Sequence, residues 1–328
     1  MTTTSTSRRA LALIALMGVV VLAWPHSASA SSTDATATST CTSTAKTNPL
    51  TSAKAVALGA VEGITEFLPI SSTGHLLITE RILHLDFPKA ADSCLKDAID
   101  TFTVAVQIGA ILAVLGIYRR RVVTMFEGIV GRSEEGRRSV IALAVAFVPA
   151  AIIGVALNKP IKNHLLSSWP VVGAWIVGGI VILAFVANQS RLRVTITSMA
   201  DLGMRNALII GVAQAVSLWP GVSRSLVTIL AALLVGMSLS AAVEFSFLLG
   251  VVTLSAATVY ELGKGGKDMV DQFGVATPLL ATAVAALTAF LAVKFMIGWL
   301  NRHGLALFGW YRIILGVGVG IAIATKVI

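Results

Sequence analysis

Long apolar stretches separated by short polar connections dominate the chain. Six of them are long enough to cross the roughly 30 Å of hydrocarbon in a bilayer as α-helices. They lie at 101–118, 139–157, 171–188, 241–262, 277–297 and 308–325. The pattern therefore predicts an all-α, polytopic membrane protein with six transmembrane helices.

Basic residues in the connections predict the orientation. The connection 119–138 carries six arginines and the connection 189–206 carries three. Both should lie in the cytoplasm, because Lys and Arg are retained on that side of the membrane. Alternation then places 158–170, 263–276 and the carboxyl end outside, together with everything before residue 101.

Two further apolar segments, 53–80 and 207–239, are interrupted by Gly, Pro and polar clusters. We expect re-entrant helix–loop–helix hairpins, since non-helical backbone at membrane depth is found only where protein or a polar cavity satisfies it. The segments match at a constant shift of 152 residues: Gly59 with Gly211, Glu62 with Gln214, Phe67 with Trp219, Ile70 with Val222, Ser71 with Ser223, and Thr73 with Ser225. One hairpin is entered from outside and the other from inside, which predicts an inverted repeat.

The amino end differs from the rest of the chain. A basic pair precedes a short apolar run and a small-residue tract that ends at Ala30, which is the order of a secretory signal. We predict a signal peptide over 1–30, with an uncleaved helix as the alternative. A Ser/Thr-rich disordered tether over 31–50 and a membrane-embedded domain over 51–328 follow.

Composition and charge exclude several classes of protein. Hydrophobic residues make up 56% of the chain and charged residues 12%, where soluble domains have about 25% charged residues. This excludes a water-soluble globule and a disordered chain. The net charge of +9 would suggest nucleic acid in a soluble protein. Here most basic residues lie between apolar runs, so we predict no nucleic-acid partner.

Two carboxylates stand in the first hairpin. Glu62 and Glu66 are four residues apart and share one helix face, where they repel each other unless a cation or an arginine lies between them. Ionisable groups at membrane depth indicate function, although a solvent-facing pair at the interface is the alternative. Hard carboxylate oxygens suit a divalent cation, Mg²⁺ or Ca²⁺. We therefore predict Glu62 and Glu66 as metal ligands.

A hydroxyl cluster and a histidine follow these acids. Ser71, Ser72 and Thr73 offer hydroxyls to a phosphate, and Gly74 permits close approach of the backbone. His75 suits an acid, a base or a nucleophile, with a structural histidine as the alternative. Ser72 is the first choice for the attacking group, because His75 lies three residues on and can act as its base. Attack by His75 or by water stays open.

The second hairpin carries Arg224 between Ser223 and Ser225, directly after a Pro-Gly break. A guanidinium fork suits phosphate, and the start of a new helix also favours an anion. The alternative to phosphate binding is an ion pair between Arg224 and Glu62 or Glu66. Both roles are possible for Arg224 before substrate binds. Together the two hairpins favour phosphoryl transfer at the membrane.

Three motifs carry a family resemblance: E-G-x-T-E-F-L-P-x-S-S-T-G-H at 62–75, L-W-P-G-x-S-R-S at 218–225 and E-F-S-F-L-L at 244–249. From about residue 50 onward the chain resembles the undecaprenyl-diphosphate phosphatase family, also known as the bacitracin-resistance phosphatases. The resemblance implies hydrolysis of undecaprenyl diphosphate to undecaprenyl phosphate and inorganic phosphate, which recycles the lipid carrier of cell-wall synthesis. It also implies the bacterial inner membrane, a divalent cation and a site that opens to the extracytoplasmic side.

The resemblance also implies roles for single residues. These are metal or base-positioning acids (Glu62 and Glu66), phosphate-binding or nucleophilic hydroxyls (Ser71, Ser72 and Thr73), an acid/base (His75) and a diphosphate clamp (Arg224 with Ser223). The chain departs from the family at Leu226, where Gly is usual, and at Val252, near which Pro is usual. We expect these departures to alter the shape of the pocket and to leave its chemistry intact.

Some alternatives stay open. Secondary carriers also bind their substrates in inverted repeats, so the rival function is a lipid-phosphate flippase. The hydroxyl and histidine cluster favours an enzyme, since an anion carrier needs no nucleophile. Membrane lipid is the expected surrounding, and a homodimer is one of the oligomeric states considered. Cys41 and Cys94, both predicted outside, form either a disulfide or two free thiols.

Overall fold

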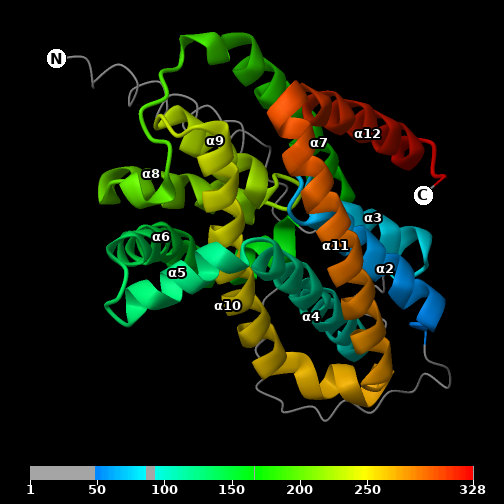
Figure 1. The fold of residues 1–328 in the computed structure, drawn as a ribbon. Helices are drawn as coiled ribbons and strands as arrows, with labels where there is room; N and C mark the ends of the chain where they lie inside the picture. Colours follow the sequence, from blue (N-terminus) through cyan, green and yellow to red (C-terminus); the bar gives the residue numbers. More distant parts are fainter. Residues whose placement is uncertain (1–48, 86–92, 166, 328) are drawn as a thin grey trace.

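The computed structural model describes residues 49–85, 93–165 and 167–327, and this part of the chain is mainly helical (Figure 1). Its α-helices are α2 (Ser52–Thr65), α3 (Ser72–Ile82), α4 (Ser93–Ile117), α5 (Arg119–Ile129), α6 (Glu134–His164), α7 (Ser168–Asn188), α8 (Met204–Gln214), α9 (Arg224–Leu234), α10 (Leu239–Phe273), α11 (Ala276–His303) and α12 (Ala306–Ala324). The predicted all-α fold is confirmed for these residues.

Six helices of the described residues are long and apolar enough to cross a membrane, namely α4, α6, α7, α10, α11 and α12. They correspond one to one to the six predicted spans, and the chain is a multi-pass membrane protein. All six extend beyond the predicted apolar stretches at one end or both. Residues 93–100 and most of the connections predicted at 158–170 and 263–276 are therefore helical. α10 continues through Gly263, Gly265 and Gly266 to Phe273, because no proline interrupts it, and Gly274 with a φ of 68° ends the helix.

The interrupted segments form two pairs of short helices, α2 with α3 and α8 with α9. A proline lies in each break, Pro69 in the first and Pro220 in the second. Proline disfavours a helical conformation of the residue before it, which accounts for a break at the same place in both pairs. The helix–loop–helix form agrees with the prediction, and its re-entrant placement in a bilayer stays a prediction.

The two halves of the chain pack on each other reciprocally. Each half is a hairpin followed by three spans: α4, α6 and α7 after the first hairpin, and α10, α11 and α12 after the second. The first helix of each hairpin packs against the second span of the other half, α2 on α11 and α8 on α6. The first spans pair with each other, as do the third spans. This exchange of partners is what an internal repeat predicts, and Figure 1 shows α2 alongside α11.

Two matched glycines allow the hairpins to approach the opposite half. A Cβ atom on Gly59 would lie 2.4 Å from the carbonyl oxygen of Ala281 in α11. A Cβ atom on Gly211 would lie 2.3 Å from the carbonyl oxygen of Ala146 in α6. The pair found 152 residues apart in the sequence therefore has one function, which is close backbone packing across the repeat.

The amino end is described only from residue 49. Leu50 is buried in an apolar cluster with α2 and α4, so the end of the tether predicted over 31–50 belongs to the folded domain. The physical reason is that an apolar side chain directly before a helix gains free energy by covering its first turn. The predicted signal peptide and Cys41 lie outside the described residues, so the disulfide with Cys94 stays a prediction.

Candidate active site

The second helix of each hairpin begins at a serine with the same unusual backbone. Ser71 has φ 73° and ψ 101°, and Ser223 has φ 74° and ψ 114°. Each hydroxyl accepts a hydrogen bond from the amide three residues on, at 3.5 Å from Gly74 and 3.3 Å from Leu226. Such a conformation costs a non-glycine residue about 1–3 kcal/mol, and strain of this kind concentrates at functional sites.

Hydroxyl groups join the two breaks to each other. The Ser225 hydroxyl donates a hydrogen bond to the carbonyl of Leu68 at 2.9 Å, and its oxygen lies 3.1 Å from that of Ser223. Ser225, predicted to bind substrate, is fully buried, and its hydroxyl is occupied by the opposite hairpin. Ser225 therefore has a structural role, because it connects the second hairpin to the first.

A buried arginine in α12 forms hydrogen bonds to the breaks of both hairpins. Arg312 is fully buried and donates to the carbonyls of Pro69 at 3.3 Å and Gly221 at 2.9 Å, and also to two carbonyls of α7. Gly178 leaves room for it, since a Cβ atom there would lie 2.2 Å from Nη2. Arg312 was not predicted from the sequence as a site residue. The signal was a charged residue inside the predicted span 308–325, where ionisable groups indicate function.

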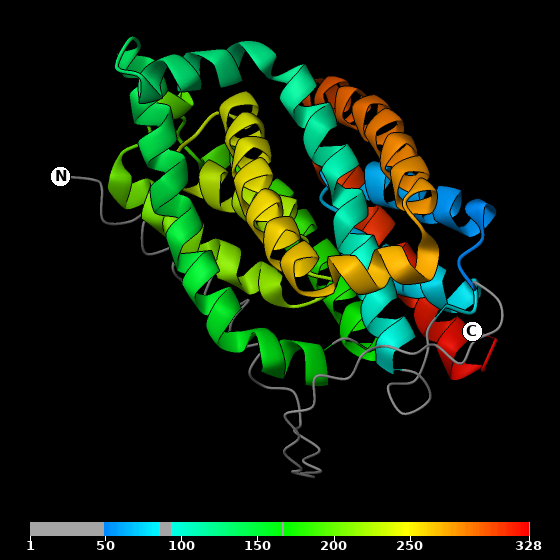
Figure 2. The same cartoon turned by 90° about the horizontal axis from the view of Figure 1, so that it is seen from below.

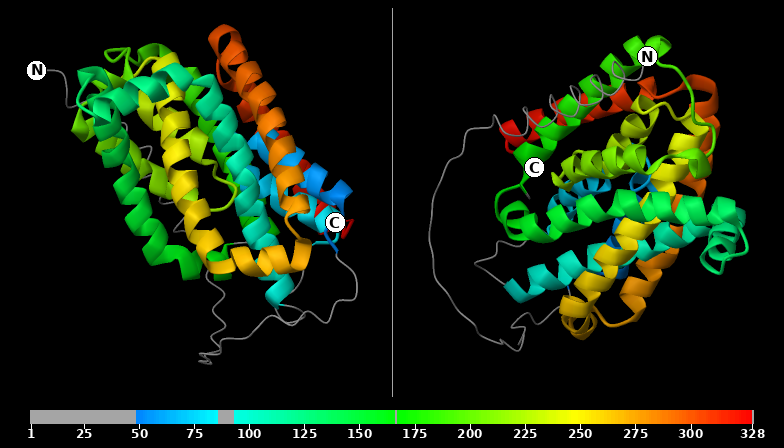
Figure 3. Two further views of the ribbon diagram at one scale, coloured as in Figure 1. Left: turned by 60° about the horizontal axis from the view of Figure 1, so that its bottom comes forward. Right: turned by 90° about the vertical axis from the view of Figure 1, so that its left-hand side faces the viewer.

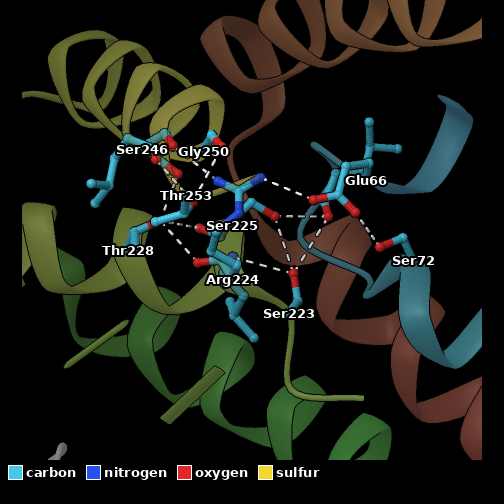
Figure 4. Close-up of polar contacts among 12 residues, drawn as sticks. Glu66, Ser72, Ser223, Arg224, Ser225, Thr228, Ser246, Gly250 and Thr253 are labelled. Carbon is cyan, nitrogen blue, oxygen red and sulfur yellow. Dashed lines mark hydrogen bonds and ion pairs between the residues drawn. The ribbon is translucent and has the colours of Figure 1, made fainter. Parts of the chain in front are cut away.

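Arg224 reaches from the start of α9 toward α10 and the first hairpin (Figure 4). Its Nη1 donates to the carbonyl of Ser246 at 3.1 Å, and its Nη2 donates to Glu66 Oε1 at 3.1 Å. The guanidinium lies 5.2 Å from the centre of the Phe67 ring. The pairing of Arg224 with one of the two acids, which the sequence left as the alternative to a phosphate clamp, is present with Glu66.

The other carboxylate oxygen of Glu66 is bound by Ser72. The Ser72 hydroxyl donates a short hydrogen bond to Glu66 Oε2 across the break, and Figure 4 shows Ser72 and Arg224 on opposite sides of this carboxylate. The chain Ser72–Glu66–Arg224 thus joins a hydroxyl, a carboxylate and a guanidinium. An adjacent base of this kind is what a serine needs to become a nucleophile.

These groups line a cavity of about 490 Å³. Its polar end is made by the two hairpins, with Glu66, Ser71, Ser72, Thr73, Ser223 and Arg224 in the lining. Its apolar wall comes from α6 and α10, which contribute small and aliphatic side chains such as Ala150, Gly154, Leu254 and Ala257. The cavity therefore presents an anion-binding end and a hydrocarbon-like wall to one ligand.

His75 and Gly74 lie away from this lining. The ring nitrogens of His75 lie 2.7 Å from the carbonyl oxygen of Ser71 and 2.8 Å from the hydroxyl of Tyr311. Gly74 packs against the Trp175 ring, which a Cβ atom would approach to 2.7 Å. Both ring nitrogens of His75 are thus occupied, while the hydroxyl of Ser72 is hydrogen-bonded to Glu66.

Glu62 is fully buried, and neither of its carboxylate oxygens has a hydrogen-bond partner among the described residues. Gln214, its counterpart in the repeat, also has a buried side-chain oxygen with no such partner, and it lines the cavity. Orphaned hard oxygens fit a divalent cation. No group of three His, Cys, Asp or Glu suited to a metal is found in the described residues, so further ligands would be hydroxyl, amide or substrate oxygens.

The two departures from the family pattern lie outside the polar end of the cavity. Leu226 is buried in the apolar core beside Phe67 and Phe247, so its side chain does not narrow the approach to the hydroxyls. Helix α10 passes through Val252 without interruption, as expected where a proline is missing. Neither departure disturbs the contacts of Arg224 or Ser72.

Comparison with known proteins shows the family of this chain. The family described as bacitracin resistance protein BacA matches residues 55–318. A protein named undecaprenyl-diphosphatase from Sorangium cellulosum is 42% identical over 264 residues, which cover 80% of this chain and 83% of the relative. Undecaprenyl-diphosphatase 2 of Rhodospirillum rubrum is 43% identical over 269 residues, or 81% and 93% of the two chains. The chain therefore belongs to the bacitracin resistance protein BacA family.

Proposed function

We propose that this protein hydrolyses undecaprenyl diphosphate to undecaprenyl phosphate and inorganic phosphate, and so recycles the lipid carrier of cell-wall synthesis. The observation that carries the proposal is the Ser72–Glu66–Arg224 chain at the polar end of a cavity with an apolar wall. The names of the relatives supply the substrate. Bacitracin resistance follows from the same activity, as the family description suggests.

Ser72, Glu66 and Arg224 each have a role in this reaction. Ser72 Oγ forms a bond to the terminal phosphorus while Glu66 accepts its proton. The bond from that phosphorus to the bridging oxygen breaks, and undecaprenyl phosphate leaves. Arg224 stabilises the negative charge on the phosphoryl oxygens. Water then cleaves the phosphoserine and releases inorganic phosphate.

The assay for this function is phosphate release from undecaprenyl diphosphate by the purified full chain in detergent. We expect turnover by the wild type and none by Ser72→Ala. A detergent solution has no second compartment, so a flippase releases no phosphate there. Absence of turnover with the wild type, combined with lipid movement across a reconstituted bilayer, would favour the carrier function instead.

The apolar wall is the site that we assign to the prenyl tail. Gly154 lies in this wall, and a Cβ atom there would meet only the Leu218 side chain, at 3.5 Å or more. We expect Gly154→Trp to fold and to raise the KM for undecaprenyl diphosphate by about tenfold, because the ring displaces buried tail contacts. The KM for a short prenyl diphosphate should change little.

Gly298→Trp is the matched control for this prediction. Gly298 lies in α11, and a Cβ atom there would meet nothing within 4 Å apart from its chain neighbours and the backbone of its own helix. It is absent from the cavity lining. Equal changes in KM for the long and short substrates, or an equal effect of the control, would refute the assignment of the tail site.

We further propose that Glu62 helps to hold the divalent cation, Mg²⁺ or Ca²⁺, with Glu66 nearby. When bound, the cation would neutralise charge on the diphosphate. Glu62→Gln should weaken Mg²⁺ binding by about tenfold, because it removes a charged hard ligand. Isothermal titration calorimetry of the purified protein measures this without any substrate. Glu127→Gln on α5 is the control, and an unchanged affinity of Glu62→Gln would exclude ligation.

The location that we propose is the bacterial inner membrane, with the cavity open to the extracytoplasmic side. The support is the course of the lining helices. α6 and α10 both leave the predicted cytoplasmic side, and their lining residues extend from Phe147 to Val155 and from Thr253 to Glu261, toward the predicted outer ends. A homodimer stays a prediction.

A further inference from the structure

A second cavity lies where α4 passes into α5, and none of its lining residues belongs to the hairpins. It has a volume of about 650 Å³ and lies between the α4–α5 corner and α11. We call it the basic groove, and its lining residues are Gly116, Ile117, Tyr118, Arg119, Arg120, Arg121, Thr124, Glu244, Phe290 and Lys294. It shares no residue with the lining of the active-site cavity.

The groove has an excess of positive charge. Of its four cationic side chains, Arg121 is neutralised by ion pairs with Glu244 and Glu135. Arg119, Arg120 and Lys294 are exposed and form no ion pair with any of the described residues. The ammonium of Lys294 lies 4.7 Å from the centre of the Phe290 ring. The groove thus offers three cations to an anion, beside an aromatic and aliphatic wall.

Helix α5 places this charge at the surface of the bilayer. Figures 2 and 3 show α5 lying across one end of the bundle, between α4 and α6. Its apolar residues Val123, Phe126 and Ile129 are 56%, 64% and 67% exposed, while three arginines stand in its first turn. An amphipathic helix with an uncovered apolar face beside transmembrane helices lies in the membrane interface. Its first turn is therefore at the level of lipid headgroups.

We propose that the basic groove binds the headgroup of an anionic phospholipid. The phosphodiester lies among Arg119, Arg120 and Lys294, and an acyl chain follows Ile117 and Phe290 along the ends of α4 and α11. Basic pockets between transmembrane helices on the cytoplasmic side recognise anionic headgroups in this way. A free phosphate ion would gain nothing from the apolar wall, which favours a lipid as the source of the anion.

Native mass spectrometry of the purified full chain, titrated with phosphatidylglycerol or phosphatidylcholine, tests the proposal. We expect the wild type to bind phosphatidylglycerol at least about tenfold more tightly than the zwitterionic lipid. The triple variant Arg119→Gln, Arg120→Gln, Lys294→Gln should lose this preference. Lys294→Glu, a single change on the exposed face of α11, should weaken phosphatidylglycerol binding in the same direction if the triple variant does not fold.

The matched control removes the same charge elsewhere. Arg191, Arg193 and Arg205 are exposed, lie on the same predicted side and are absent from the groove. Their replacement by Gln should leave the lipid preference intact. A wild type without preference, an equal loss in the control, or an unchanged preference in the groove variants would overturn the proposal. Complete displacement of phosphatidylglycerol by millimolar inorganic phosphate would also overturn it, in favour of a free-phosphate site.

Discussion

Replacing Arg224 by alanine should lower kcat for phosphate release by about a thousandfold, the range found when a preorganised cationic clamp on a phosphoryl group is removed. The guanidinium is held by the Ser246 carbonyl, the Glu66 carboxylate and the Phe67 ring, so it enters the reaction already oriented. Arg224→Lys should also be strongly impaired, because an ammonium cannot reproduce the planar fork. Steady-state kinetics on the purified variants measures both effects.

A fall in activity must be separated from a loss of folding. Removing Arg224 leaves Glu66 as a buried carboxylate without its cation, and breaking a buried pair destabilises a protein by about 3–5 kcal/mol. The double variant Arg224→Ala, Glu66→Gln removes both charges, so its thermal unfolding should return toward that of the wild type while its activity stays lost. Turnover by Arg224→Ala within tenfold of the wild type would remove the clamp from the mechanism.

Ser72→Ala and Glu66→Gln should each reduce kcat to near background, and the double variant should be no worse than either single one. The reason is that the Ser72 hydroxyl donates to Glu66, so the proposed nucleophile and the proposed base should act as one unit whose losses are not additive. His75→Ala is the informative comparison. With Glu66 as the base, it should retain more activity than Ser72→Ala, since its ring contacts Tyr311 and the Ser71 carbonyl.

Trapping the covalent intermediate identifies the attacking group. Quenching during turnover of labelled substrate should yield a phosphoserine at residue 72, because Ser72 is the hydroxyl that has a base. Phosphohistidine at residue 75 would overturn this assignment. Full release of labelled phosphate by Ser72→Ala at the wild-type rate would favour direct attack by water.

The elements were predictable because they rest on local patterns. The lengths of the apolar stretches predicted the six spans, and the positions of glycines and prolines predicted the break in each hairpin. The repeat was also visible, since the match of Ser71 with Ser223 extends to their backbone angles. Helix ends were less predictable, because hydropathy marks the apolar section of a helix and hydrogen bonding continues beyond it.

The pairings within the site depend on tertiary structure. Spacing suggested His75 as the partner of Ser72, whereas the fold turns Glu66 back across the break and engages His75 with Tyr311, which lies 236 residues on. Arg312 shows the same limit. Its presence inside a span was visible in the sequence, but the carbonyls it binds come from three separate elements that only the fold assembles.

Arg312 also sets an order for assembly during synthesis. It lies in α12, the last helix of the described residues, yet one of the carbonyls it binds belongs to Pro69, 243 residues earlier in the chain. In the part of the chain that the structure describes, both hairpins and five of the six long helices therefore precede the arginine that links the two breaks. Until it is synthesised, each break keeps backbone acceptors exposed to its surroundings. The candidate site is therefore completed only after α12 has been synthesised, so chains truncated before Arg312 should reach the membrane and be inactive.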